Sequence, residues 1–182
     1  MAVNYQLAVR QSILHKIAIY LQQDGSRDMT IPLNFNNGIA DFLFNTTTYG
    51  IVPLEAGQTA FYPGVSILPL DEEDAVTGRS HLTKKRYILP VKIFVGKEIS
   101  GNTRPQVVKA EVLEVCKLVL QCLSDGVVQI WDYSDLNNPV STGIRATYGN
   151  TPYSFKDESV AVPGGDIRMG CVVQLNYIDL SL

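Results

Sequence analysis

The stretch PQVVKAEVLEVCKLVLQCL, residues 105–123, decides the fold. Its apolar side chains recur every three or four residues, which is the spacing of one face of an α-helix. Pro105 suits the first turn, Thr103 can cap the start, and Ser124-Asp125-Gly126 can end the helix. Two neighbouring apolar stripes are expected, one of Val108, Val112, Val115, Val119 and Cys122, the other of Leu113, Cys116, Leu120 and Leu123. So wide an apolar surface predicts a helix that lies across a sheet as its main packing partner.

Segments of strand composition lie on both sides of this helix. Before it come 65–70 and 84–95, which we expect to be neighbouring strands. In the second of these, alternation places Tyr87, Leu89, Val91, Ile93 and Val95 on one face and Lys92 on the other. After the helix, the strand-like segments are 127–133, 143–148 and 171–178.

A second amphipathic helix is predicted at the N-terminus, from about Tyr5 to Gln23, with Asn4 as its cap and Asp24-Gly25 at its end. The resulting order of helix, strands, long helix and strands is not the regular alternation of a doubly wound fold. We therefore expect one α+β domain over residues 1–182. It would be a mostly antiparallel sheet packed by two amphipathic helices, with loop-rich insertions at about 26–60 and 134–169.

Composition narrows the classes of function. The chain of 182 residues has 46% hydrophobic and 18% charged residues and a net charge of −3, values of a globular protein without a general phosphate-binding surface. We expect no specific recognition of nucleic acid. No apolar run approaches about 18 residues and no secretory signal is visible, so neither a membrane span nor export is expected. Cys116, Cys122 and Cys171 are interpreted as reduced core thiols.

Residues for catalysis or metal binding are few. The two histidines, His15 and His81, lack the spacing of metal ligands, and we assign both to structural or solvent roles. No catalytic group, cofactor or metal is therefore predicted, and the chain is expected to bind and assemble. The rival hypothesis is a small enzyme or ligand-binding domain that uses carboxylates such as Glu55, Asp71 or Asp132 together with Tyr133.

Two groups of residues are candidates for contacts with a subunit or partner. The first is charged: an acidic run followed by a basic run could be a solvated hairpin tip or a contact with a neighbouring subunit. The second is aromatic and lies in the loop-rich segment, as a loop folded over the core or as a patch buried between subunits. The residues are Asp71, Glu72, Glu73, Asp74, Lys84, Lys85 and Arg86 in the charged group, and Phe35, Phe42 and Phe44 in the aromatic group.

The order of elements resembles the tail terminator proteins of tailed bacteriophages. The likeness is carried by Phe61-Tyr62-Pro63-Gly64-Val65 leading to Leu70-Asp71-Glu72-Glu73, then by 87–95 and 107–123, and it spans roughly 4–133 and 171–178. It implies a structural virion protein that forms a hexameric ring, caps the tail tube and joins it to the neck or head. The expected partners are further copies of the chain, the tail tube protein and neck proteins, in a ring through which DNA can pass.

The same resemblance implies a place in the tail or neck of the virion, after assembly in the host cytoplasm. Other head-to-tail connector proteins share this small α+β architecture and remain an alternative. A further alternative is an adaptor domain of a cellular contractile machine built on the same plan.

Overall fold

Two helices and nine strands make up the part of the chain that the computed structural model describes. That part comprises residues 5–22, 41–52, 61–67, 76–79, 85–101, 103–135, 138–148, 155–157 and 165–179. The fold is α+β, as predicted. The elements in chain order are α1 (Tyr5–Leu21), β1 (Phe42–Asn45), β2 (Gly50–Val52), β3 (Gly64–Ile67), β4 (Val76–Arg79), β5 (Lys85–Glu98), α2 (Pro105–Leu123), β6 (Val127–Asp132), β7 (Val140–Tyr148), β8 (Lys156–Asp157) and β9 (Asp166–Asp179).

The strands form one antiparallel sheet in the order β2-β1-β3-β5-β9-β7-β6. Its spine is the pair β5 and β9, which runs without a shift from Lys85 opposite Asp179 to Glu98 opposite Asp166. Strand β3 pairs with residues 93–96 of β5, which confirms the prediction that these two strands are neighbours. Strand β4 pairs with residues 85–88, at the start of β5. Pro90 lies between these two paired stretches, a position that suits a residue without an N–H.

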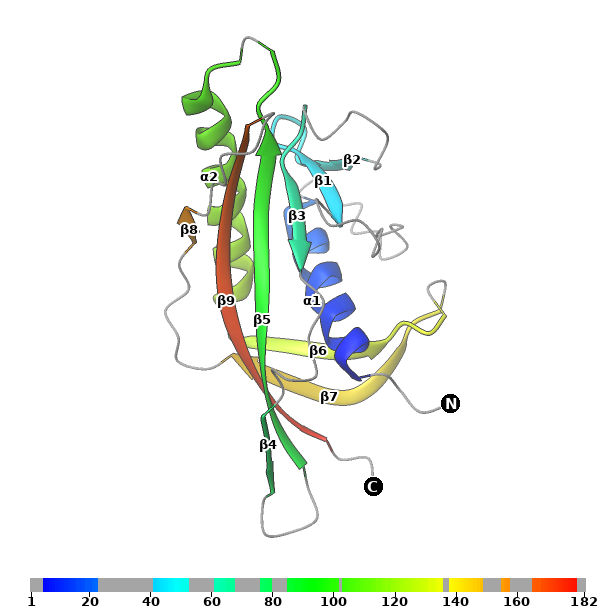
Figure 1. Ribbon diagram of the computed structural model, residues 1–182. Coiled ribbons are helices and arrows are strands. Elements are labelled where there is room, and N and C mark those ends of the chain that lie inside the picture. The colour runs from blue at the N-terminus through cyan, green and yellow to red at the C-terminus, as the bar shows by residue number, and fades with distance from the viewer. Residues whose placement is uncertain are drawn as a thin grey trace.

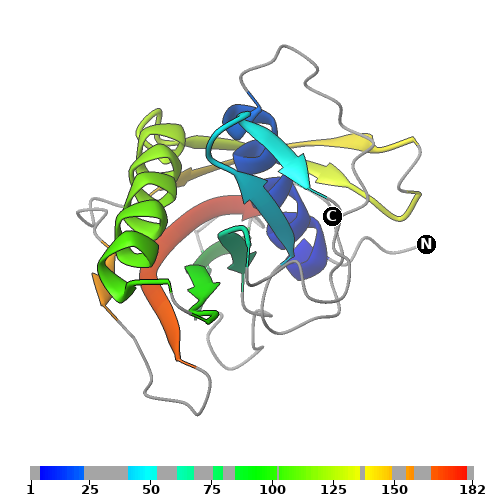
Figure 2. The ribbon, with the colours of Figure 1, turned by 90° about the horizontal axis from the view of Figure 1, so that it is seen from above.

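Both helices lie on the same side of the β5–β9 spine (Figure 1). Strands β6 and β7 run steeply across the direction of β5 and β9, so the sheet bends around the helices (Figure 2). Helix α2 packs on β5 and β9, and α1 packs mainly on β6. The core therefore fills the space between the bent sheet and two helices, whereas the sequence pattern predicted α2 as the main packing partner.

Helix α2 begins and ends where the sequence predicts, and its first apolar stripe is buried in full. The prediction for the second stripe is wrong at one position, because Leu113 is 47% exposed while Cys116 and Leu123 are buried. The predicted cap is also wrong: Arg104 occupies the N-cap position in an extended conformation, without a side-chain cap bond. The end follows expectation, since Gly126 adopts the left-handed conformation with φ of 73°.

A buried ion pair joins α1 to the outer part of the sheet. Arg10 donates to Oδ1 of Asp41 at 2.7 Å and to the carbonyl of Ile67 at 3.0 Å, and the N–H of Ile67 donates to Oδ2 of Asp41 at 2.8 Å. Burial raises the pKa of the Asp41 carboxyl, and the Ile67 N–H and Arg10 act in the opposite direction. The three groups satisfy one another where water has little access.

All three cysteines are free and buried, in agreement with their assignment as core thiols. Among the described residues, neither helix combines the length and the hydropathy that crossing a bilayer would require.

Candidate functional site

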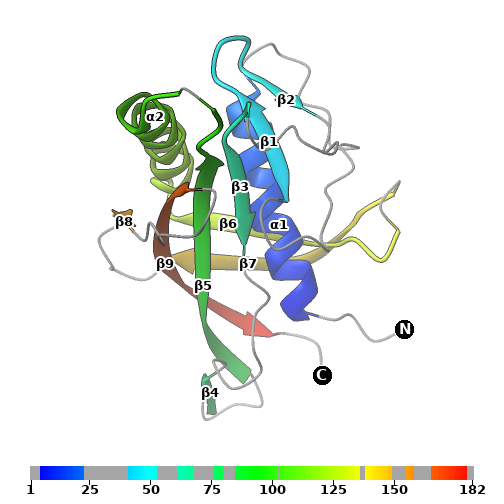
Figure 3. The ribbon, with the colours of Figure 1, turned by 45° about the horizontal axis from the view of Figure 1, so that its top comes forward.

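The charged candidates for a partner contact map onto a projecting part of the sheet. Strand β4, residues 85–88 of β5 and residues 176–179 of β9 form a three-stranded extension, here called the arm. The arm extends past the ends of both helices (Figures 1 and 3). Lys85 and Arg86 lie in the arm. The other charged candidates and one aromatic candidate lie outside the described residues: Asp71, Glu72, Glu73, Asp74, Lys84 and Phe35. Glu55 of the rival carboxylate site lies outside them as well.

The strand register pairs two positions of the arm that both hold basic residues. Arg79 of β4 is directly opposite Lys85 of β5, and Lys85 is opposite Asp179 of β9 on its other side. Arg86 is the next residue of β5. By composition, the described positions at the outer end of the arm therefore hold more basic than acidic residues.

The aromatic candidates Phe42 and Phe44 are core residues and not an intersubunit patch. They belong to β1, and their exposed fractions are 2% and 0%. Of the two interpretations from sequence, a loop folded over the core and a patch buried between subunits, their burial agrees with a place in the core, and the pairing of β1 with β2 and β3 shows that the segment is a strand of the sheet and not a loop. The short apolar run did not reveal this, because its place within the sheet depends on pairing with β3, which follows only after the breaks at Pro53, Gly57 and Pro63.

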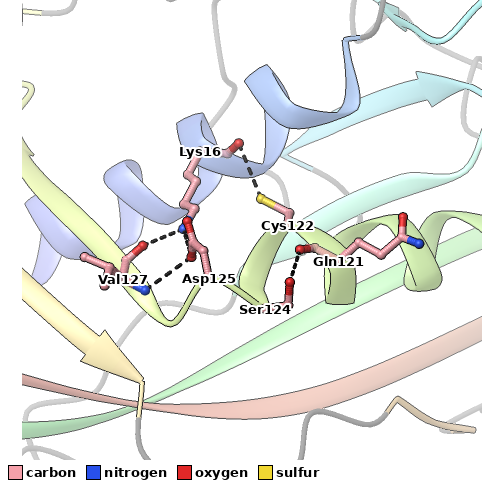
Figure 4. Close-up of polar contacts among 6 residues, drawn as sticks. All are labelled: Lys16, Gln121, Cys122, Ser124, Asp125 and Val127. Carbon is pink, nitrogen blue, oxygen red and sulfur yellow. Dashed lines mark hydrogen bonds and ion pairs between the residues drawn. The ribbon is translucent and has the colours of Figure 1, made fainter.

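A cleft of about 960 Å³ opens between α1, the C-terminal end of α2 and strand β6. Figure 4 shows part of its lining, where Lys16 of α1 reaches Asp125 in the turn after α2 and Val127 at the start of β6. The lining combines aromatic, amide and charged side chains. It consists of Ser12, His15, Lys16, Ile19, Tyr20, Gln22, Gln121, Cys122, Asp125, Val127, Val128, Gln129, Trp131, Tyr133 and Arg145.

Lys16 forms an ion pair with Asp125 of the cleft lining and also contacts the backbone at the start of β6. Its ammonium donates to Oδ1 of Asp125 and to the carbonyl of Val127, both at 2.5 Å. The same Asp125 oxygen accepts the N–H of Val127 at 3.2 Å, and the thiol of Cys122 lies 3.7 Å from the carbonyl of Lys16. These contacts tie α1, the end of α2 and the start of β6 together.

His15 lies in the wall of the cleft, stacked on Tyr133. The two rings are 4.4 Å apart at their centroids and inclined by 7°, and His15 is 5% exposed. Its Nε2 atom is buried and has no hydrogen-bond partner within the described part of the chain. Burial lowers the pKa of His15 to about 4 and raises the pKa of Tyr133 and of Cys122 each to about 12. At neutral pH these groups are an imidazole, a phenol and a thiol, all uncharged.

The rival carboxylate site is only partly assembled. Tyr133 lines the cleft, but Asp132 accepts the N–H of Ser134 at 2.9 Å as part of a turn. Within the described ranges, no three His, Cys, Asp or Glu side chains lie together as metal ligands would.

Sequence reasoning missed this cleft, because it brings together residues more than 100 positions apart. One local signal exists: Ser12, His15, Lys16 and Ile19 follow helical spacing and place three polar groups on one face of α1. Neither the sequence around His15 nor the sequence around Tyr133 indicates that the two rings stack.

Comparison of the chain with protein-family models, with curated proteins and with solved structures finds no match.

Proposed function

We propose that this chain is a structural protein of a bacteriophage tail, a tail terminator whose copies form a ring at the end of the tail tube. The observation that carries the proposal is the arm. A ring of identical subunits requires one surface of each subunit to grip a different surface of the next. A strand extension that leaves the body of the domain is suited to that task.

The arm has the composition of a surface that another molecule covers. Large apolar residues occupy successive positions of its strands, and successive positions alternate between the two faces of a sheet. Tyr87 is paired with Tyr177, and the next residue, Ile88, is paired with Val76. Neither α1 nor α2 extends over it (Figure 3). A sheet with apolar residues on both faces is stable when both faces are covered. In the proposed ring, the adjacent subunit supplies that cover.

The resemblance in element order supports the finer assignment to the tail terminator, with the tail tube and neck proteins as partners. Another connector ring of the head-to-tail junction would use the same arm, and so would an adaptor of a cellular contractile machine. What separates these alternatives from the proposal is the tube or neck component that the ring binds.

Assembly of the purified chain tests the proposal. Light scattering coupled to size exclusion should report a closed oligomer, and negative-stain images should show rings, free or on the ends of purified tail tubes. A chain that stays monomeric at high concentration and ignores tail tubes would contradict the proposal.

Charge reversal in the arm tests the part of the surface involved. The double substitution Lys85→Glu and Arg86→Glu should abolish rings while leaving the circular dichroism of the monomer unchanged. Lys92→Glu is the matched control, because Lys92 is exposed on the same strand outside the arm. Rings formed equally well by both variants would exclude the arm as the contact.

A further inference from the structure

The cleft between α1, the C-terminal end of α2 and β6 contains a guanidinium without a counter-charge among the described residues. Arg145 of β7 is exposed and lines the cleft, and it forms no ion pair within the described ranges. Its Nε lies 3.4 Å from the amide oxygen of Gln129, which leaves the two terminal nitrogens without a partner in this part of the chain. A guanidinium can bind a carboxylate through two parallel hydrogen bonds.

The lining of the cleft has one more positive than negative charge. Its ionised side chains are Lys16, Asp125 and Arg145, and the first two pair with each other at 2.5 Å (Figure 4). Burial keeps His15 neutral, with a pKa of about 4. The chain as a whole has a net charge of −3, so the cleft is opposite in sign to the rest. Its unpaired charge therefore favours an acidic occupant.

Aromatic side chains lie beside this charge. Trp131 is half-buried and Tyr20 is 43% exposed, and both line the cleft. Gln129 connects Arg145 to Ser141, because its amide nitrogen donates to that hydroxyl at 3.2 Å. Ser141 is directly opposite Trp131 in the register of β6 and β7. Tryptophan, tyrosine and arginine are the residues that most often dominate the binding energy of protein interfaces, so the lining favours a protein segment with apolar and acidic side chains.

Such a segment would bind through its side chains and not as an added strand. The backbone of β6 is already engaged from α1, because Ser12 accepts the N–H of Trp131 and Lys16 donates to the carbonyl of Val127. A peptide strand would have to displace both contacts. The cleft volume of about 960 Å³ is at the upper end of the range of about 300 to 1,000 Å³ that accepts a drug-sized molecule, which leaves room for several side chains.

The chain itself contains a segment of this chemistry. In residues 68–74, LPLDEED, two leucines precede the only run of more than two consecutive acidic residues in the sequence. In the sequence, the segment comes directly before β4, the first strand of the arm. A ring of identical subunits needs two different surfaces that fit each other. A segment next to the arm and a cleft between the helices and β6 are two such surfaces.

We propose that this cleft receives the acidic segment 68–74 of an adjacent subunit, with a carboxylate of residues 71–74 paired to Arg145 and apolar side chains against Trp131 and Tyr20. This inference rests on the proposed ring, and it names the surface that receives the neighbour.

Peptide titration tests the contact without requiring a ring. The titrated protein is the double variant Glu72→Lys and Glu73→Lys, whose own segment no longer complements the cleft. The probe is the peptide LPLDEEDAV, residues 68–76. Trp131 is the single tryptophan and lines the cleft, so its fluorescence reports binding. The peptide should give a saturable change, and the neutral peptide LPLNQQNAV should give none.

Adding Arg145→Gln should weaken peptide binding about tenfold or more, because it removes the counter-charge. Arg104→Gln is the matched control, since Arg104 is exposed at the N-terminal end of α2, away from the cleft. Benzoate serves as a small acid. The inference is overturned if the acidic peptide does not bind, or if the neutral peptide or benzoate binds as tightly. It is also overturned if the two arginine substitutions, with unchanged circular dichroism, have equal effects.

Mixing of charge-reversed subunits separates this inference from ring formation itself. Arg145→Glu alone and the double variant Glu72→Lys and Glu73→Lys alone should each fail to form rings, whereas an equal mixture should form rings in which the two alternate. Rings formed by Arg145→Glu alone, or a mixture that forms none, would overturn the cleft contact and leave the ring proposal standing. An unsubstituted chain that forms no ring contradicts the ring proposal instead, and the titration then decides the cleft contact by itself.

Discussion

The hydroxyl of Ser12 in α1 accepts a hydrogen bond from the backbone N–H of Trp131 in β6, at 2.9 Å. The same hydroxyl donates to the carbonyl of Ala8, one turn earlier in the helix, at 2.6 Å. One turn later, Lys16 engages the carbonyl of Val127 at the other end of β6. Helix α1 thus covers an edge strand whose unpaired backbone groups would otherwise be open to pairing with another chain.

Ser12→Ala should lower the free energy of unfolding by about 1 to 2 kcal/mol, because it leaves the N–H of Trp131 without its partner in a partly buried place. Urea denaturation followed by tryptophan fluorescence measures the change, since Trp131 is the single tryptophan. Ser134→Ala, at an exposed position, is the matched control and should stay within about 0.5 kcal/mol of the unsubstituted protein. Equal effects of the two substitutions would contradict the role of Ser12.

Asp41→Asn should be far more destabilising, by about 3 kcal/mol, since it removes one charge of the buried ion pair between Asp41 and Arg10. Asp157→Asn provides the comparison, because Asp157 pairs with Lys109 at 2.9 Å where both side chains are almost half exposed. That change should cost less than about 1 kcal/mol. Denaturant midpoints of the two variants, measured side by side, decide the matter, and a reversed ranking would refute the prediction.

His15 should make stability fall with acid. Its pKa is about 4 in the folded protein against 6.5 for the free group, so the unfolded chain binds the proton more tightly between these values. The contribution is fully present above about pH 6.5 and is lost as the pH falls toward about 4, with a loss of about 2 kcal/mol by about pH 4.5. Denaturation of the unsubstituted protein and of His15→Phe at several pH values measures it. The variant should lack this part of the slope, and identical slopes would show that His15 does not cause it.

Val112 and Leu113 are neighbours in α2 with opposite environments, at 0% and 47% exposed. Val112→Ala should cost about 2 kcal/mol through lost burial. Leu113→Ala should change stability by less than about 0.5 kcal/mol, because alanine favours the helix and the leucine side chain loses little burial. Thermal denaturation of the pair is sufficient, and a larger loss for Leu113→Ala in the monomer would show that its environment is misassigned.

Regular elements could be predicted where local signals agree. The limits of α2 follow from Pro105 at the start, the glycine turn at 126 and apolar spacing between them, and the structure has the same limits. The strands of 84–95 and 127–133 were found from alternation and composition, although β5 continues to Glu98. The prediction failed for Leu113, and it left open whether Phe42 and Phe44 cover the core or a contact between subunits, because burial depends on which surface of the sheet each element meets.

What the sequence determined by itself was the α+β class, the extent of the two helices and the three buried thiols, because helical and strand periodicity act over a few residues. Tertiary structure alone decided the sheet order, the arm and the cleft. Ser12 meets Trp131 across 119 positions of sequence, and His15 meets Tyr133 across a similar distance. Such contacts depend on how the sheet bends around α1, and no local pattern encodes that bend.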